Sequence, residues 1–201
     1  MRTLFLSVLF LAAYMSAKSQ AAVTLLTFES YTFADKFETE YGFGKIYDGF
    51  QWGGGFEFGD PNGSNLELIY QHLDADAIYD GYNQEYTGKV GVNYILIGGT
   101  RYTPINEKVS GFGSFDLGVG FLSSSDLDID APAKFSLGGR LGLRIATSEK
   151  ISFRIHAQLL SPTQWFGGGF YFGTGGSGAG VSTGSTIYQF NLGGSVNIRM
   201  K

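Results

Sequence analysis

One pair of side chains has the types needed for nucleophilic catalysis. Ser152 and His156 fall on the same face of an alternating segment, and a serine beside a histidine is the nucleophile and base of many hydrolases. Four positions along a strand separate such side chains by about 13 Å, which is too far for a hydrogen bond between them. The spacing therefore predicts no catalytic residue.

Three aspartates, Asp126, Asp128 and Asp130, alternate in a way that could supply oxygen ligands to calcium. The glycine and the distal bidentate glutamate of a dedicated calcium loop are missing from this segment. The chain also has no cysteine, which excludes disulfides, thiolate zinc sites and cysteine nucleophiles. The sequence thus predicts neither a metal site nor a bound cofactor.

The N-terminal segment indicates export. Arg2 precedes an apolar run over residues 4–14, and small residues follow at 17–21. This pattern predicts a signal peptide over residues 1–19, cleaved between residues 19 and 20 or between 21 and 22, and a single domain over 20–201. A net charge of −4 and a pI of about 5.1 exclude the basic footprint of a nucleic-acid-binding protein.

The rest of the chain alternates with a period of two, which is typical of strands that separate two environments. The alternating segments are 50–59, 65–73, 88–103, 115–121, 135–145, 151–159 and 188–198, with a weaker one at 22–33. Their polar positions carry glycine, serine, asparagine, glutamine and arginine, with lysine missing from mid-strand. A water-soluble barrel alternates too, but small polar residues suit the inside of a narrow membrane barrel better than a solvated surface.

The apolar positions are therefore expected to face lipid. Aromatic residues near strand ends are placed at the membrane interfaces: Trp52, Tyr70, Tyr102 and Tyr188. For the segment 88–103 this alternation predicts two faces. The residues expected to face lipid are Val90, Val92, Tyr94 and Leu96. Those expected to face the lumen are Gly91, Asn93, Gly99 and Arg101. Ile95 and Ile97 are exceptions to that pattern.

The connections between these segments alternate in length. Those at 60–64, 104–108 and 147–150 are short, and those at 34–49, 74–87, 122–134 and 161–185 are long. Short periplasmic turns and long extracellular loops are typical of outer-membrane barrels. The fold predicted is all-β: an eight-stranded antiparallel up-and-down transmembrane β-barrel. In this pattern the chain resembles the small outer-membrane β-barrel proteins of Gram-negative bacteria, such as OmpA, OmpX and OmpW.

Charged residues on the lumen side are expected to pair, because an unpaired charge in a poorly solvated interior costs several kcal/mol. The predicted lumen polar network consists of Glu57, Glu67, Arg101, Asp116, Arg140, Arg144, Arg154 and Arg199. Because the five arginines outnumber the three carboxylates, a narrow channel that prefers anions is the alternative to a structural plug of the lumen. An eight-stranded barrel is just wide enough for its own side chains, which favours the plug.

The last long connection differs from the others because it lies within a stretch, residues 155–198, that contains no Asp, Glu, Lys or Arg. It carries the candidate partner loop, formed by Trp165, Phe166, Phe170, Tyr171 and Phe172. We expect this loop to fold over the barrel mouth or to dock on a partner, with a flexible low-complexity segment as the alternative.

The sequence predicts a non-enzymatic barrel of the bacterial outer membrane, surrounded by outer-membrane lipid, with a structural or interaction role through its extracellular loops. It could serve as a subunit of a larger envelope complex, with a protein partner at those loops and no nucleic-acid partner. A narrow porin-like or OmpW-like channel for small solutes and a membrane-embedded lipid hydrolase are the two alternatives.

Overall fold

The computed structural model describes residues 22–39, 42–60, 62–81, 84–123, 133–162, 168–173, 176–181 and 188–200. These ranges contain twelve β-strands: β1 (Ala22–Thr32), β2 (Asp35–Thr39), β3 (Gly42–Ile46), β4 (Gly49–Gly59), β5 (Ser64–Gly81), β6 (Gln84–Pro104), β7 (Val109–Ser123), β8 (Lys134–Ala146), β9 (Ile151–Pro162), β10 (Gly168–Gly173), β11 (Gly176–Val181) and β12 (Gln189–Arg199). Within the same ranges no helix is long and apolar enough to cross a membrane.

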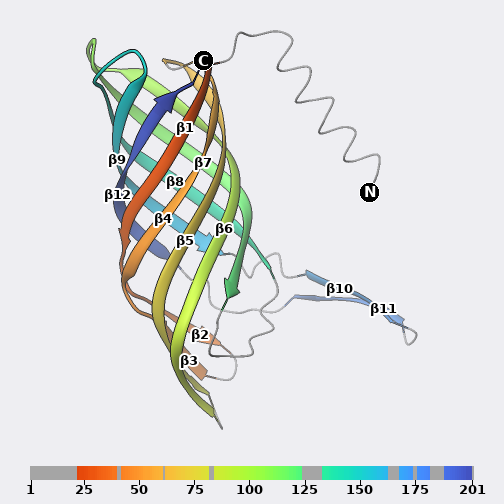
Figure 1. The fold of residues 1–201 in the computed structure, drawn as a ribbon. Helices are drawn as coiled ribbons and strands as arrows, with labels where there is room; N and C mark the ends of the chain where they lie inside the picture. Colours follow the sequence, from red (N-terminus) through yellow and green to blue (C-terminus); the bar gives the residue numbers. More distant parts are fainter. Residues whose placement is uncertain are drawn as a thin grey trace.

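Eight of these strands close into a barrel (Figure 1). Their order is β5-β4-β1-β12-β9-β8-β7-β6, every neighbouring pair is antiparallel, and the pairing of β5 with β6 completes the ring. A closed ring leaves no sheet edge, so each strand finds its hydrogen-bond partners within the protein. This is the condition that lipid imposes on a membrane-spanning sheet, and it confirms the predicted fold.

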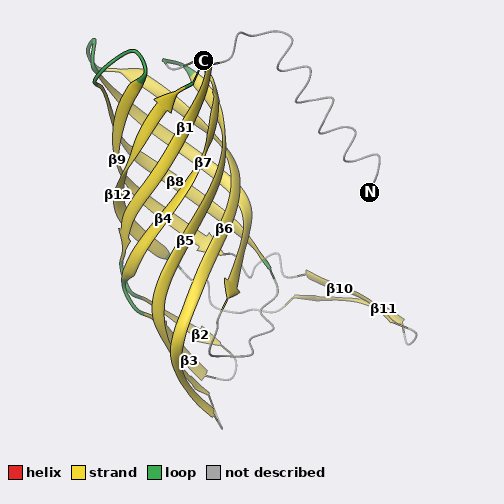
Figure 2. Ribbon diagram, viewed as in Figure 1, coloured by secondary structure: helices red, strands yellow, loops and turns green. Residues whose placement is uncertain are grey.

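The three short turns between β4 and β5, β6 and β7, and β8 and β9 lie at one end of the barrel, together with the described ends of the chain (Figure 2). Side chains hold these turns: Asn106 accepts hydrogen bonds from the backbone nitrogens of Lys108 and Val109 at 2.9 and 2.8 Å, and Asp60 accepts one from Asn62 at 2.9 Å. Because short turns of outer-membrane barrels face the periplasm, this is the periplasmic end.

At the opposite end, strands occupy two segments that the sequence predicts as loops. β2 and β3 form within 34–49, while β5 and β6 continue to Gly81 and Gln84 across most of 74–87. We call β2, β3, residues 75–81 of β5 and residues 84–90 of β6 the outer sheet. Isoleucine, tyrosine and threonine in these segments favour strands, and Ile46 and Ala75 are buried there.

The structure describes the two remaining predicted loops only in part. Residues 124–132 of the third loop lie outside the described residues. In the fourth, β10 and β11 pair as a separate two-stranded hairpin, from Gly168 opposite Val181 to Gly173 opposite Gly176.

The register of β6 turns its side chains opposite to the predicted direction. Leu96 lies opposite Ile69 with both side chains fully buried in the lumen, whereas Ile97 lies opposite Leu68 with about half of each side chain exposed toward lipid. Val90, Val92, Tyr94 and Tyr102 are buried with Leu96. The prediction was wrong because Ile95, Leu96 and Ile97 are all apolar, so only pairing with β5 can decide the facing.

Cysteine substitutions at neighbouring positions of β6 would verify this facing, since the chain has no cysteine of its own. A spin label attached to Ile97→Cys should collide readily with oxygen dissolved in the bilayer, because that side chain faces lipid. The Leu96→Cys thiol should stay unreactive until the barrel is unfolded. Electron paramagnetic resonance in lipid vesicles measures both, and the opposite pattern would restore the facing predicted from sequence.

Candidate functional site

The candidate site is a cluster of charged side chains inside the periplasmic half of the barrel. Five different strands contribute to it: Glu57 from β4, Glu67 from β5, Asp116 from β7, Arg140 from β8 and Arg154 from β9. Each of these residues is at most 4% exposed. We call these five residues the ion-pair network.

Cross-strand register brings the three carboxylates close together. Glu57 lies directly opposite Glu67, and Gly98 separates Glu67 from Asp116 in the same row. A Cβ atom at Gly98 would lie 2.2 Å from the Asp116 carboxylate, so only glycine leaves room for that side chain. Carboxylates placed so near one another require cations between them.

Two arginines supply those cations. Arg140 donates through Nη2 to Glu67 and to both carboxylate oxygens of Asp116, the latter at 3.2 Å. Its Nε also donates to Asp116 Oδ2 at 3.3 Å. Arg154 donates through Nη1 to Glu67 Oε1 at 2.8 Å and through Nη2 to Glu57. Glu67 therefore binds both guanidinium groups, one on each of its oxygens.

Tyr102 extends the network toward the periplasm. Its hydroxyl donates to Glu57 Oε2 at 2.7 Å, and the guanidinium groups of Arg144 and Arg154 lie 4.9 and 5.1 Å from its ring centre. Cation–π contacts of this kind are strongest where water is excluded. With Arg144 included, three cations face the three carboxylates.

The outer half of the lumen is filled by neutral side chains. Gln71 and Gln158 exchange two hydrogen bonds of 3.1 Å, Tyr94 donates to Gln189 at 2.6 Å, and Asn191 donates to Gln51 at 2.8 Å. An apolar cluster packs around them and is at most 2% exposed: Leu26, Phe28, Ile69, Leu73, Leu96 and Leu160. Both halves of the interior are thus packed with side chains.

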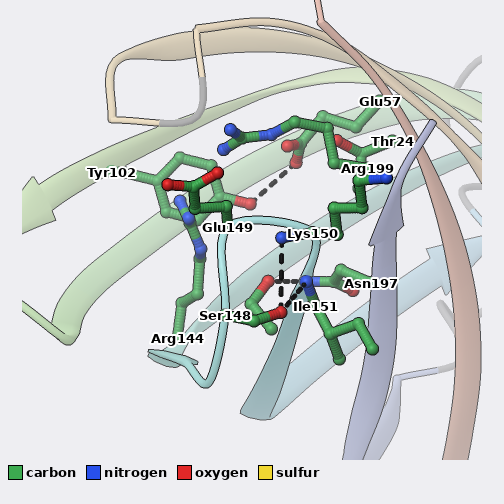
Figure 3. A pocket seen from close by; sticks show the side chains of 11 residues that line it. Thr24, Glu57, Tyr102, Arg144, Ser148, Glu149, Lys150, Ile151, Asn197 and Arg199 are labelled. Carbon is green, nitrogen blue, oxygen red and sulfur yellow. Dashed lines mark hydrogen bonds between the residues drawn. The ribbon is translucent and has the colours of Figure 1, made fainter. Parts of the chain in front are cut away.

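A pocket marks the periplasmic mouth of the barrel (Figure 3). Arg144, Arg199 and Lys150 line it together with Glu57 and Glu149. Its free volume of about 20 Å³ is enough for about one water molecule. The mouth therefore brings cationic side chains together without opening a path into the lumen.

The structure brings most of the predicted lumen residues together, but not all. Five form the ion-pair network: Glu57, Glu67, Asp116, Arg140 and Arg154. Arg144 and Arg199 are half-buried at the mouth. The prediction was wrong for Arg101, whose side chain is exposed on the outer surface of the barrel. Its neighbours Thr100 and Tyr102 face the lumen, so Arg101 must face outward.

The other predicted positions do not gather at this site. Trp165 and Phe166 lie outside the described residues, and Phe170, Tyr171 and Phe172 belong to β10, paired through the backbone with β11. A docking role for that loop stays a prediction.

Ser152 and His156 both turn into the lumen without contacting each other. Ser152 Oγ accepts a hydrogen bond from Asn197 at 3.4 Å, and the His156 ring packs edge-on against Phe28 at 6.2 Å between centres. Neither ring nitrogen has a hydrogen-bond partner among the described residues. The pair has no nucleophile–base geometry.

Sequence reasoning missed a polar cluster on the outward face near the outer rim. Asn93 accepts hydrogen bonds from Tyr70 and His72 at 2.8 and 2.7 Å and donates to Ser123 at 3.0 Å, while His72 also contacts Asp74 at 3.1 Å. Asn93 is only 5% exposed. These polar groups satisfy one another, as a surface bordering lipid requires. Their cross-strand register was the missing information.

The closed barrel, its lipid-facing apolar surface and its packed lumen define a small eight-stranded β-barrel of the bacterial outer membrane. Among solved structures, the chain is similar to Neisserial surface protein A, with a TM-score of 0.57, 12% identity and coverage of 88% of this chain and 97% of that one. It is also similar to OprG from Pseudomonas aeruginosa, with a TM-score of 0.53, 10% identity and coverage of 89% and 97%. No protein-family model and no curated protein sequence matches the chain. At these identities the likeness is one of fold.

Removing Glu67 should destabilise the barrel strongly, because two buried guanidinium groups would each lose a partner. We expect Glu67→Ala to lower the free energy of unfolding by about 3–5 kcal/mol. The control Ser152→Ala removes one lumenal hydrogen bond and should cost about 1 kcal/mol. Urea titration in lipid vesicles, followed by tryptophan fluorescence, measures both; equal losses would show that Glu67 has no special role.

Proposed function

We propose that this protein is a non-enzymatic, non-conducting outer-membrane barrel that acts through its extracellular part, as a structural or interaction protein of the envelope. The packed lumen carries this proposal. Five buried charged residues and an apolar cluster fill a barrel whose interior has room for little else.

The lumen argues against the channel alternative. Arg140 and Arg154 cross the interior to reach carboxylates on other strands, so moving either one would leave a buried charge unpaired. The next layer outward is held by the Gln71–Gln158 pair and by leucines that exclude water. A solute would have to displace both layers.

The outer sheet offers the surface for an interaction. A membrane-spanning strand needs about 9–11 residues, whereas β5 has 18 and β6 has 21, so both project well beyond the bilayer. β2 is the last strand of the outer sheet and, among the described residues, pairs with β3 alone. Its other side is an edge to which a partner strand could add.

Several contacts fasten the outer sheet to the rim of the barrel. The backbone nitrogen of Tyr47 donates to Asp76 O at 2.8 Å, and that of Tyr188 donates to Asp35 at 2.6 Å. Tyr31 donates to the Asp48 carboxylate, and this hydrogen bond holds the pKa of Asp48 below its usual range. An anchored, charged surface is better suited to binding than to gating.

In planar lipid bilayers the protein should produce no discrete conductance steps, because its lumen is packed. Conductance should stay at the level of the protein-free bilayer at either voltage polarity. The variant Glu67→Ala serves as a comparison, since losing this carboxylate loosens the network. Stable single-channel steps from the unaltered protein would contradict the proposal and favour a narrow pore.

Shortening the β5–β6 hairpin should abolish any specific partnership without unfolding the barrel. We would replace residues 77–88 by Asn-Gly, a two-residue turn that preserves the pairing of Asp76 with Lys89. Affinity purification from outer membranes with mass spectrometry should show that proteins retained by the full chain are lost. A matched alteration of the periplasmic turn 105–108 should retain them, and identical captures from all three forms would contradict the role assigned to the outer sheet.

A further inference from the structure

A groove runs over the lipid-facing surface of β6, β7 and β8 near the periplasmic end. It has a volume of about 390 Å³ and is lined by Gly99, Arg101, Gly113, Phe115 and Leu141, with Ser64 of β5 at its border. That volume is in the range of small-molecule sites, about 300–1,000 Å³. It lies outside the lumen and apart from the ion-pair network.

Missing side chains create the hollow. Gly99 lies opposite Phe115, and Gly113 lies between Arg101 on one neighbouring strand and Leu141 on the other. A Cβ atom added to Gly99 would meet only a backbone oxygen at 3.7 Å. Phe115 and Leu141 are 58% and 71% exposed and form apolar walls beside the glycines.

Arg101 supplies a cation at the border of this hollow. It lies three residues before the end of β6 at Pro104, or about 10 Å along the strand. Its side chain is exposed, and within the described part of the chain its guanidinium has no ion pair or hydrogen-bond partner. On a lipid-facing barrel surface, arginine is tolerated only near an interface, where its head reaches the lipid headgroups.

We propose that this groove binds one phospholipid of the periplasmic leaflet. The phosphodiester accepts hydrogen bonds from the Arg101 guanidinium, which matches phosphate oxygens in a two-pronged geometry. Ser64, directly opposite Arg101 across the β5–β6 pair, adds a hydroxyl donor. One acyl chain lies over Gly99 and Gly113 between Phe115 and Leu141, where its methylene groups fill a hollow that protein side chains leave open.

Native mass spectrometry of the purified barrel tests this site, with phosphatidylglycerol and phosphatidylethanolamine added separately to detergent micelles. We expect one tightly retained lipid per barrel. Arg101→Gln should weaken its binding about tenfold, through loss of a charge-assisted hydrogen bond. Gly113→Leu should weaken it similarly by filling the groove. The added Cβ would lie 3.2 Å from Leu141 Cδ2, and Leu141 can shift because it is 71% exposed. Both variants should fold because these side chains point outward.

Two control variants match the tests. Gly111→Leu places the same side chain two positions away on the same face of β7, outside the groove lining, and Lys108→Gln removes a charge from the periplasmic turn. Both should retain lipid as the unaltered protein does. Equal lipid loss from all four variants, or none from Arg101→Gln, would overturn the site. Loss from Arg101→Gln but not from Gly113→Leu would reject the acyl-chain position and leave a headgroup contact only.

Discussion

The pairing of charges inside the barrel is the constraint on which the rest of the structure depends. Glu67 binds two arginines that reach it from β8 and β9, and those arginines also neutralise carboxylates on β4 and β7. The network thus links five of the eight barrel strands through side chains, in addition to the backbone ladders. Register slips of one residue would turn these charges toward lipid, so the network specifies the register as well as filling the space.

Lipid outside and a packed lumen inside impose different demands on the same strands. Outside, every backbone group must be paired and charges are confined to the interfaces, as the closed ring and the position of Arg101 illustrate. Inside, volume is limiting, so Gly98 occurs where a carboxylate needs its space. Glycine consequently serves both surfaces: it makes room for a neighbour in the lumen and leaves a hollow at Gly99 and Gly113.

Alternation in the sequence was sufficient to predict eight strands, their antiparallel order and the periplasmic turns, because a polar face and an apolar face differ in composition. It failed where composition does not differ. The run Tyr94-Ile95-Leu96-Ile97 is apolar at every position, so its facing, and with it the position of Arg101, follows only from pairing with β5. The outer strands were missed for a related reason, since outside the membrane both faces of a strand can be polar.

The ion-pair network was foreseeable as a set of residues but not as a set of contacts. Glu57, Glu67, Asp116, Arg140 and Arg154 all occupy polar positions of alternating segments, yet Tyr102, predicted at an interface, bonds to Glu57. β5 and β6 run without interruption from this network through the membrane into the outer sheet, so the same two strands carry the paired charges and the projecting surface. A filled lumen is therefore compatible with the function proposed above, in which the projecting sheet presents one edge to a partner.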